Sequence, residues 1–397
     1  MIPISKPFLN EKEAAAAGEA VLSGWVSQGP KVKEFEEAFA DYVGTKYACA
    51  VSNCTTALHV ALLAVGVQPG DIVVTVSHSF ISTANCIRFC GAEPIFVDID
   101  PDTFNLSPDC LEAMFRKDCQ VKGGRLIYGR DRVKRPVAAI VVVHQMGMPC
   151  DLKKILDLAK RYRLPVVEDA ACAIGSEISF DKGKRWEKIG RPRGDIACFS
   201  FHPRKVITTG EGGMLTTHRR DYDKKFRSLR HQGMSVSDLV RHQARKVIFE
   251  EYPKLGYNYR MTDIQAAIGL EQLKKLPEII ARRREIAAFY HQELSSLAWL
   301  KIPFEPGDRR TNWQSYPLRV LDHAPLSRDA LMQYLLDKGI ATRRGIMNAH
   351  QEKIYASRKW HLPQSELARD SVILLPLFCQ MKEEDCHYCV EQIKAVK

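Results

Sequence analysis

The chain has 397 residues, 45% of them apolar and 26% charged, which is enough sequence for a full hydrophobic core and for a large domain plus a smaller one. No apolar run approaches the roughly 18 residues of a membrane span, and the first residues lack a signal-peptide pattern, so we expect a cytosolic protein without a membrane segment. The formal charge of +11 is compatible with nucleic acid, but phosphorylated small molecules fit it equally well. Because no long basic tract is present, we expect no nucleic-acid partner.

Twelve cysteines are scattered along the chain, several of them inside apolar runs, and this distribution is typical of reduced core thiols rather than of a disulfide framework. Cys386 and Cys389 form the one pair with metal-ligand spacing. A single C-x-x-C in a polar C-terminal helix lacks the second pair that a structural zinc site needs, so we expect no metal.

From about residue 30 to 217, short β-branched runs alternate with helical patterns, which indicates βαβ units and a mostly parallel sheet of seven strands. The expected strands are Tyr47–Val51, Ile72–Val76, Pro94–Val97, Val137–Val143, Pro165–Glu168, Ile196–Ser200 and Gly213–Thr216. The helices expected between them are Val32–Val43, Thr55–Val65, Ile81–Cys90 and Leu152–Arg163.

The polar stretch 181–193 is expected to be a surface loop or hairpin. Further along, the pattern predicts a helix over Thr262–Lys275 and a second, basic helix from about Pro277 to Leu297. A strand near 316–321 and helices near 327–338 and 383–395 then indicate a small α+β domain. We therefore expect a large α/β domain over 1–280 and a small C-terminal domain over 281–397, linked by a long helix.

Lys205 stands between the strand-like run that ends in Ser200 and the glycine-rich turn 208–213. Most lysines are solvated surface charges, but a lysine in such a crowded turn would be poorly hydrated. Burial lowers the pKa of a lysine and makes it a competent amine nucleophile. We therefore expect Lys205 to form a covalent bond with an aldehyde.

Asp169 follows the apolar run that begins at Pro165, at the point where an open α/β sheet presents groups to a ligand. Pyridoxal phosphate requires an amine to hold its aldehyde and an anion to keep its ring nitrogen protonated. Lys205 and Asp169 could supply these two groups.

The segment Ser52-Asn-Cys-Thr55-Thr56 follows a strand and opens an amphipathic helix, so its free amides and hydroxyls could hold the phosphate. An ordinary threonine cap is the alternative. Ser200 would add a second hydroxyl to the same anion. Phe80 lies just past a strand end, where it could stack on a planar ring, although a lone phenylalanine is more often part of the core.

Asp98 and Asp100, in Phe-Val-Asp-Ile-Asp, are more typical of strand ends and turns than of catalysts. We therefore do not expect either carboxylate to take part in chemistry.

In this order, the segments resemble the DegT/DnrJ/EryC1/StrS sugar aminotransferases, which have the fold-type I architecture of aspartate aminotransferase. The resemblance covers nearly the whole chain. It rests on the motifs at 52–59, 96–100, 167–171, 200–213 and 256–267.

The resemblance implies that Lys205 binds pyridoxal phosphate and that Asp169 pairs with the ring nitrogen. It also implies that Phe80 stacks on the ring and that three hydroxyl residues hold the phosphate, namely Thr55, Thr56 and Ser200. Asn258 matches an asparagine that reaches the phosphate from the neighbouring subunit, which implies a homodimer with shared active sites. Cys172 departs from the family, because many members have Gln or His there, beside the cofactor; a thiol is a weak hydrogen-bond donor.

Some members replace the lysine with histidine and are sugar dehydratases, whereas Lys205 indicates a transaminase. The expected reaction moves an amino group from an amino acid, glutamate in the first place, to a keto-sugar that carries a nucleotide, in the biosynthesis of amino sugars for surface polysaccharides or secondary metabolites. The candidate residues on the substrate side are Arg260, Arg343, Arg344 and His350. The alternatives are amination of a cyclitol or a sugar phosphate, and a non-catalytic protein of the same fold that binds a ligand and regulates.

Overall fold

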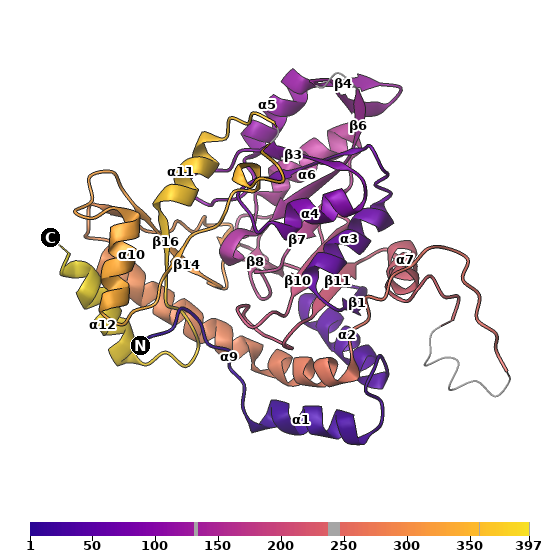
Figure 1. Cartoon of the computed structure of the whole chain (residues 1–397), viewed down its shortest axis with the longest axis horizontal. Helices are drawn as coiled ribbons and strands as arrows, with labels where there is room; N and C mark the ends of the chain where they lie inside the picture. The colour runs from indigo at the N-terminus through magenta and orange to yellow at the C-terminus, as the bar shows by residue number, and fades with distance from the viewer. Residues whose placement is uncertain (131–133, 237–246, 357, 397) are drawn as a thin grey trace.

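The computed structural model describes residues 1–130, 134–236, 247–356 and 358–396. In this part of the chain a nine-stranded sheet lies between helices (Figure 1). Seven of its strands follow one path, in the order β1–β11–β10–β7–β6–β2–β3. Their bounds are β1 (Tyr47–Val51), β11 (Gly213–Thr217), β10 (Ile196–Ser200), β7 (Val166–Asp169), β6 (Arg135–Val143), β2 (Ile72–Val76) and β3 (Glu93–Val97).

Strands β10, β7, β6, β2 and β3 run parallel, whereas β11 is antiparallel to both of its neighbours, β10 and β1. This is the large, mostly parallel sheet that the alternation of short apolar runs and helices predicts. The remaining two strands, β4 (Cys119–Lys122) and β5 (Arg125–Tyr128), form a hairpin on β6. The sequence did not predict this hairpin, because β4 is mostly exposed and shows no alternation of buried and polar residues.

Alternate residues of each strand enter opposite faces of the sheet, as the pleat requires. In β6, Ala139 and Val141 pack on one face, and Ile140 and Val142 on the other. The first face is covered by α3 (Cys54–Val65), α4 (Ser82–Phe89) and α7 (Arg220–Arg230). The second is covered by α2 (Pro30–Val43), α5 (Pro108–Asp118), α6 (Leu152–Tyr162) and the start of α9 (Asp263–Leu294).

Helix α9 is one continuous helix of 32 residues with Pro277 inside it, so the predicted break near that proline is wrong. Proline removes one backbone hydrogen bond from a helix. Here Leu273, Leu276, Ile279 and Ile280 are buried on either side of the proline, and this packing holds the helix together. Helix α1 (Glu11–Leu22), which the sequence did not predict, packs along α9 (Figure 1).

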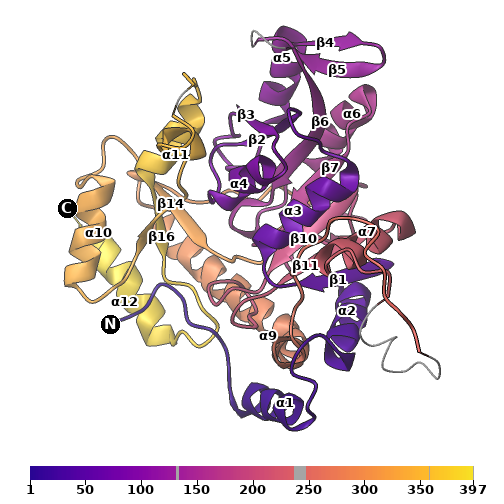
Figure 2. The same cartoon turned by 45° about the vertical axis from the view of Figure 1, so that its right-hand side comes forward.

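The second half of α9 leads into a C-terminal unit with its own apolar core (Figure 2). Its sheet has the order β12–β14–β16–β15, with bounds β12 (Leu300–Lys301), β14 (Tyr316–Val320), β16 (Val372–Leu375) and β15 (Arg343–Arg344). Its helices are α10 (Arg328–Asp337), α11 (Pro363–Ser371) and α12 (Glu383–Lys394). Ile2 also joins this unit, through a parallel bridge to Ile340.

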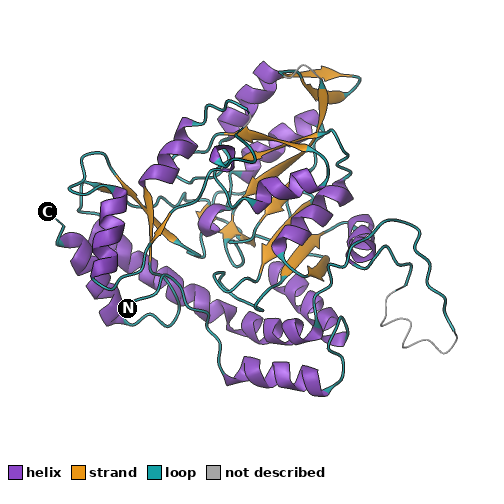
Figure 3. Cartoon of the chain, in the orientation of Figure 1, coloured by secondary structure: helices purple, strands orange, loops and turns teal. Residues whose placement is uncertain are grey.

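The stretch 181–193 belongs to a hairpin of β8 (Glu177–Ile178) and β9 (Glu187–Lys188), which β13 (Arg309–Arg310) extends. Between α7 and α9, the described residues on either side of 237–246 project from the body as a long arm and form no helix or strand (Figure 3). No helix among the described residues is long and apolar enough to span a membrane.

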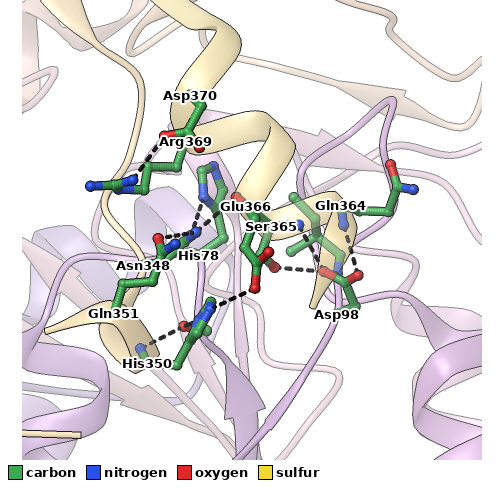
Figure 4. A network of polar contacts seen from close by, with 12 residues as sticks. His78, Asp98, Asn348, His350, Gln351, Gln364, Ser365, Glu366, Arg369 and Asp370 are labelled. Carbon is green, nitrogen blue, oxygen red and sulfur yellow. Dashed lines mark hydrogen bonds and ion pairs between the residues drawn. The ribbon is translucent and has the colours of Figure 1, made fainter. Parts of the chain in front are cut away.

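The C-terminal unit is attached to the large sheet by a cluster of polar contacts (Figure 4). Asp98, at the end of β3, accepts hydrogen bonds from the amides of Gln364 (2.9 Å) and Ser365 (2.8 Å), at the start of α11. The Ser365 hydroxyl donates to the same carboxylate at 2.6 Å. Beside it, His78 and Asn348 form an antiparallel bridge and a side-chain hydrogen bond of 2.8 Å. Asp98 therefore caps a helix of the other unit.

Replacing Asp98 with Ala should lower the free energy of unfolding by about 2–4 kcal/mol, because a buried helix start loses a charged acceptor. The matched control is Asp100→Ala. Among the described residues, the Asp100 carboxylate accepts only from Asp102 and Thr103 within its own turn, so its loss should cost about 1 kcal/mol. Urea denaturation of both variants measures the difference, and equal midpoints would contradict the assigned role.

Candidate active site

The carboxyl end of β7 places Asp169 inside the molecule, where its side chain is 4% exposed. Its two oxygens accept from Thr83 Oγ1 (2.9 Å) and from the Ala171 amide (3.2 Å). Burial raises the pKa of Asp169, although these hydrogen bonds and the charges of Lys205 and His144 oppose the rise. Among the described residues none forms an ion pair with Asp169, so the carboxylate can accept a cationic partner.

Lys205 lies in the turn after β10, where its amide donates to the His202 carbonyl. Its ammonium group donates to Cys172 Sγ at 3.0 Å. Burial lowers the pKa of Lys205, but attraction to Cys172 and the hydrogen bond to it, with smaller contributions from Cys54 and Asp169, raise the pKa above its ordinary value. The expectation of a lowered pKa is therefore wrong for the ligand-free chain, because it ignored the thiol facing the amine.

The N-terminus of α3 points into the same region. Asn53 caps it by accepting from the Thr56 amide at 2.9 Å. The sequence had suggested that this amide is free, and that expectation is wrong. The Thr56 hydroxyl also donates to the Asn53 carbonyl. No hydrogen bond from the Thr55 amide or hydroxyl is found in the described part of the chain. Thr55 is thus the residue of this turn with its donors available.

Strand register brings Ser200 to this helix terminus. Gly213 of β11 pairs with Ser200 on one side and with Val51 on the other, and Val51 leads directly into the α3 cap. A side chain at position 213 would meet the Asn53 backbone at 2.5 Å, so only glycine allows β11 to lie this close to the start of α3. The hydroxyls of Ser200 and Thr55 are thereby gathered at one end of the site.

Phe80 follows the end of β2 and is 62% exposed, which leaves its ring free to stack on a ligand. The segment that carries it is held from the C-terminal unit. The Ser77 hydroxyl accepts from the His350 amide at 2.9 Å, and His78 bridges to Asn348 (Figure 4).

Four further candidates occupy different surroundings. Asn258 is exposed at the base of the arm, where it bridges to His231, and Arg260 lies 2.8 Å from the His231 ring. Arg343 and Arg344 are exposed on β15 and form no ion pair with any residue that the structure describes. Their charges are therefore available to an anion.

His350 is buried, and both of its ring nitrogens are engaged. Nδ1 lies 2.6 Å from Ser77 Oγ and Nε2 lies 3.2 Å from Glu366 Oε1. These contacts attach the C-terminal unit to the sheet, so we do not assign His350 to the substrate.

Sequence reasoning missed Arg204 and Thr83. Arg204 is exposed next to Lys205, and partial burial together with the charge of Arg343 lowers its pKa. The side-chain amide of Gln314 holds the Arg204 carbonyl at 2.9 Å. No sequence signal could have paired residues 204 and 343, since only the tertiary fold brings them together.

The thiols of Cys386 and Cys389 lie on α12 and belong to the apolar core of the C-terminal unit. Among the described residues no group of three or more potential ligands could hold a metal ion.

A large parallel sheet with a lysine, a buried carboxylate and a capped helix terminus at its strand ends defines the fold-type I class of pyridoxal-phosphate enzymes. The comparisons with known proteins name the family. The profile of the DegT/DnrJ/EryC1/StrS aminotransferase family matches residues 7–394, and the chain belongs to this family.

Three relatives cover nearly the full length. The uncharacterized protein MJ1066 of Methanocaldococcus jannaschii is 33% identical over 100% of this chain and 97% of its own. The sugar aminotransferase CalS13 from Micromonospora echinospora is 30% identical, with a TM-score of 0.85 over 100% of both chains. Spr1654 from Streptococcus pneumoniae, a putative sugar aminotransferase solved in a PMP form, is 25% identical, with a TM-score of 0.87 over 100% and 99%. The protein is thus a transaminase that depends on pyridoxal phosphate.

The residues of this chain fit that cofactor. An aldehyde requires an amine, and Lys205 is half-buried among the strand ends. A protonated ring nitrogen requires an anion, and Asp169 is a buried carboxylate without an ion-pair partner in the described part of the chain. A phosphate is favoured by donors at a helix terminus; Thr55 lies in the first turn of α3, and strand register brings Ser200 toward it.

Replacing Cys172 with Ala should lower the pKa of Lys205, because the thiol is the largest influence that raises it. More of the amine is then neutral at mildly alkaline pH, and covalent capture of added pyridoxal phosphate should become about three- to tenfold faster. Stopped-flow absorbance of the cofactor-free protein measures this rate. The control is Cys110→Ala, on the exposed side of α5. An unchanged or slower rate in Cys172→Ala would contradict the assignment.

Proposed function

We propose that the protein moves an amino group from an amino acid, glutamate in the first place, to a keto-sugar that carries a nucleotide diphosphate. The observation that carries the chemistry is the assembly of Lys205, Asp169 and the α3 terminus at one edge of the sheet. The product would be an amino sugar for a surface polysaccharide or a secondary metabolite.

When bound, pyridoxal phosphate supplies a ring that accepts electrons from the carbon next to the transferred nitrogen. Lys205 Nζ would move the proton of the donor's α-carbon to the cofactor carbon that holds the nitrogen. In the second half of the reaction it would move a proton from that cofactor carbon to the sugar carbon that receives the nitrogen. It must be neutral to accept a proton, so its raised pKa in the ligand-free chain has to fall on loading. Asp169 holds the proton on the ring nitrogen, and Cys172 positions the lysine 3.0 Å away.

Three exposed arginines support an anionic substrate. Arg204, next to Lys205, and Arg343 and Arg344 on β15 are exposed, and none of them forms an ion pair within the described residues. Two or more unpaired guanidinium groups suit the oxygens of a diphosphate, which they can bind in bidentate fashion. A cyclitol without phosphate would leave these charges unused, whereas a sugar phosphate would use only part of them.

We further propose a homodimer in which Asn258 completes the phosphate site of the partner. Two features of the arm support it. Phe249 is 85% and Leu255 80% exposed, which is unusual for large apolar side chains, and a second copy of the chain is the occupant that would bury them. Asn258, at the base of this arm, is also exposed.

All twelve cysteines are unpaired, which supports a reducing compartment, and we propose the cytosol.

The purified protein with pyridoxal phosphate should show a visible absorbance band that glutamate converts to the pyridoxamine form. A keto-sugar nucleotide should then restore the band. Lys205→Ala should bind the cofactor but interconvert the two forms at least about 10³-fold more slowly, because it lacks the group that moves the proton.

Three other outcomes are informative. If a cyclitol or a sugar phosphate restores the band and a nucleotide sugar does not, the substrate proposal is wrong. A band that no amino acid bleaches would point to a regulatory binding protein. A chain that stays colourless would contradict the roles of Lys205 and Asp169.

Subunit mixing tests the shared site. Lys205→Ala and Asn258→Ala should each be impaired, since each variant spoils both sites of its own dimer. After the two are unfolded together and refolded, the mixed dimer has one site with both native residues and should recover part of the activity. The control mixes Lys205→Ala with Asp169→Ala, two residues of one subunit's site, where sharing predicts that activity stays low. If the first mixture gains nothing, Asn258 acts within its own chain or not at all.

A further inference from the structure

A chain of hydroxyl groups leads to the carboxylate of Asp169. Thr83, in the first turn of α4, lies with its Oγ1 2.9 Å from Asp169 Oδ2, and Ser79 Oγ lies 2.9 Å from Thr83 Oγ1. All three side chains are buried. Ser79 directly precedes Phe80, so the chain runs from the segment that carries the exposed ring to the carboxylate.

The direction of each hydrogen bond follows from the groups present. An ionised carboxylate can only accept, so Thr83 must donate its proton to Asp169. The Thr83 oxygen can then only accept from Ser79, which therefore donates. With Asp169 ionised, both hydroxyl protons point along this chain of hydrogen bonds toward the carboxylate. A hydrogen bond donated to the charged carboxylate favours the charged form over the neutral one.

The other groups around Asp169 stabilise its charged form less directly than Thr83 does. Lys205 and His144 favour the charged carboxylate from a distance. The thiols of Cys54, Cys86 and Cys198 surround it on α3, α4 and β10, and burial raises their pKa well above the ordinary value, so they stay neutral. The Ala171 amide, at 3.2 Å, is the other hydrogen-bond donor to the carboxylate among the described residues. Thr83 is thus its shortest contact.

We propose that Thr83 is a positioning residue that holds Asp169 ionised and oriented toward the ring nitrogen of the cofactor, and that Ser79 fixes the Thr83 hydroxyl in the donating direction. This inference rests on the proposed role of Asp169. It goes beyond that role because it names a neutral side chain on another element, the Thr83 hydroxyl, as the group that keeps the buried carboxylate charged.

Removing the Thr83 hydroxyl raises the pKa of Asp169 further, since burial is then opposed by one hydrogen bond fewer. The carboxylate is charged only above its pKa, so the variant needs a higher pH to hold the ring proton. The acid limb of cofactor binding should therefore move to higher pH, and the proton should leave the ring nitrogen more readily at neutral pH.

The test compares Thr83→Val, which keeps the shape, with Thr83→Ser, which keeps the hydroxyl. Thr75→Val is the matched control, because Thr75 in β2 is also buried and its hydroxyl has no hydrogen-bond partner among the described residues. Two quantities are measured on each folded protein: the dissociation constant of pyridoxal phosphate as a function of pH, and the chemical shift of its ¹⁵N-labelled ring nitrogen. The nitrogen shift reports protonation directly and would not respond to a structural defect alone.

Thr83→Val should weaken cofactor binding by about tenfold or more and move the nitrogen signal toward the unprotonated form, since it loses a hydrogen bond to a charged group. Thr83→Ser should restore both, and Ser79→Ala should give a smaller change in the same direction. Thr75→Val should leave both unchanged.

Asp169→Asn separates the two proposals. If it moves the nitrogen signal and Thr83→Val does not, Asp169 keeps its role and the role of Thr83 is refuted. If neither variant moves the signal, the proposed function of Asp169 itself is wrong. If Thr83→Val and Thr75→Val change both quantities equally, the effect is general to buried threonines and the inference is overturned.

Discussion

The burial of Asp169 is the constraint on which the site depends. A carboxylate at the end of a central strand loses most of its hydration, and such a charge is costly unless donors or a cation compensate it. The chain supplies two hydrogen-bond donors and, within the described residues, no ion pair. The low polarity of the protein interior also strengthens the attraction between this carboxylate and a protonated ring nitrogen, because little water screens the two charges. The burial that makes the Asp169 charge costly without a ligand therefore strengthens its attraction to the cofactor.

The opposite end of the cofactor site depends on strand register. Ser200, Gly213 and Val51 lie in one row across β10, β11 and β1, and Val51 leads into the start of α3. The antiparallel strand β11 can lie this close to the helix only because it has no side chain at Gly213. A shift of one residue in β11 would separate the Ser200 hydroxyl from the α3 terminus, so backbone pairing determines where a phosphate could bind.

The contacts that attach the C-terminal unit to the sheet also place Phe80 and the exposed arginines of β15, which are candidate residues for the cofactor and the substrate. Asp98 caps α11, and the Ser77–His78 segment binds the backbone and side chains near Asn348 (Figure 4). Phe80 lies two residues after His78, and β15 with its exposed arginines belongs to the attached unit. The same contacts therefore place the aromatic ring and the basic residues relative to the strand ends. Because they involve a buried carboxylate and backbone pairing, they resist rearrangement.

The sequence by itself determined the sheet and most of its strand ends, and it indicated Lys205 and Asp169 as candidate site residues, because apolar alternation and glycine-rich turns are local signals. It could not give the continuity of α9 across Pro277, which depends on buried neighbours on both sides of the proline. The raised pKa of Lys205 likewise depends on Cys172, a residue 33 positions away. Only the tertiary structure placed Thr83 against Asp169, since contacts between distant segments arise from packing, and no local pattern encodes them.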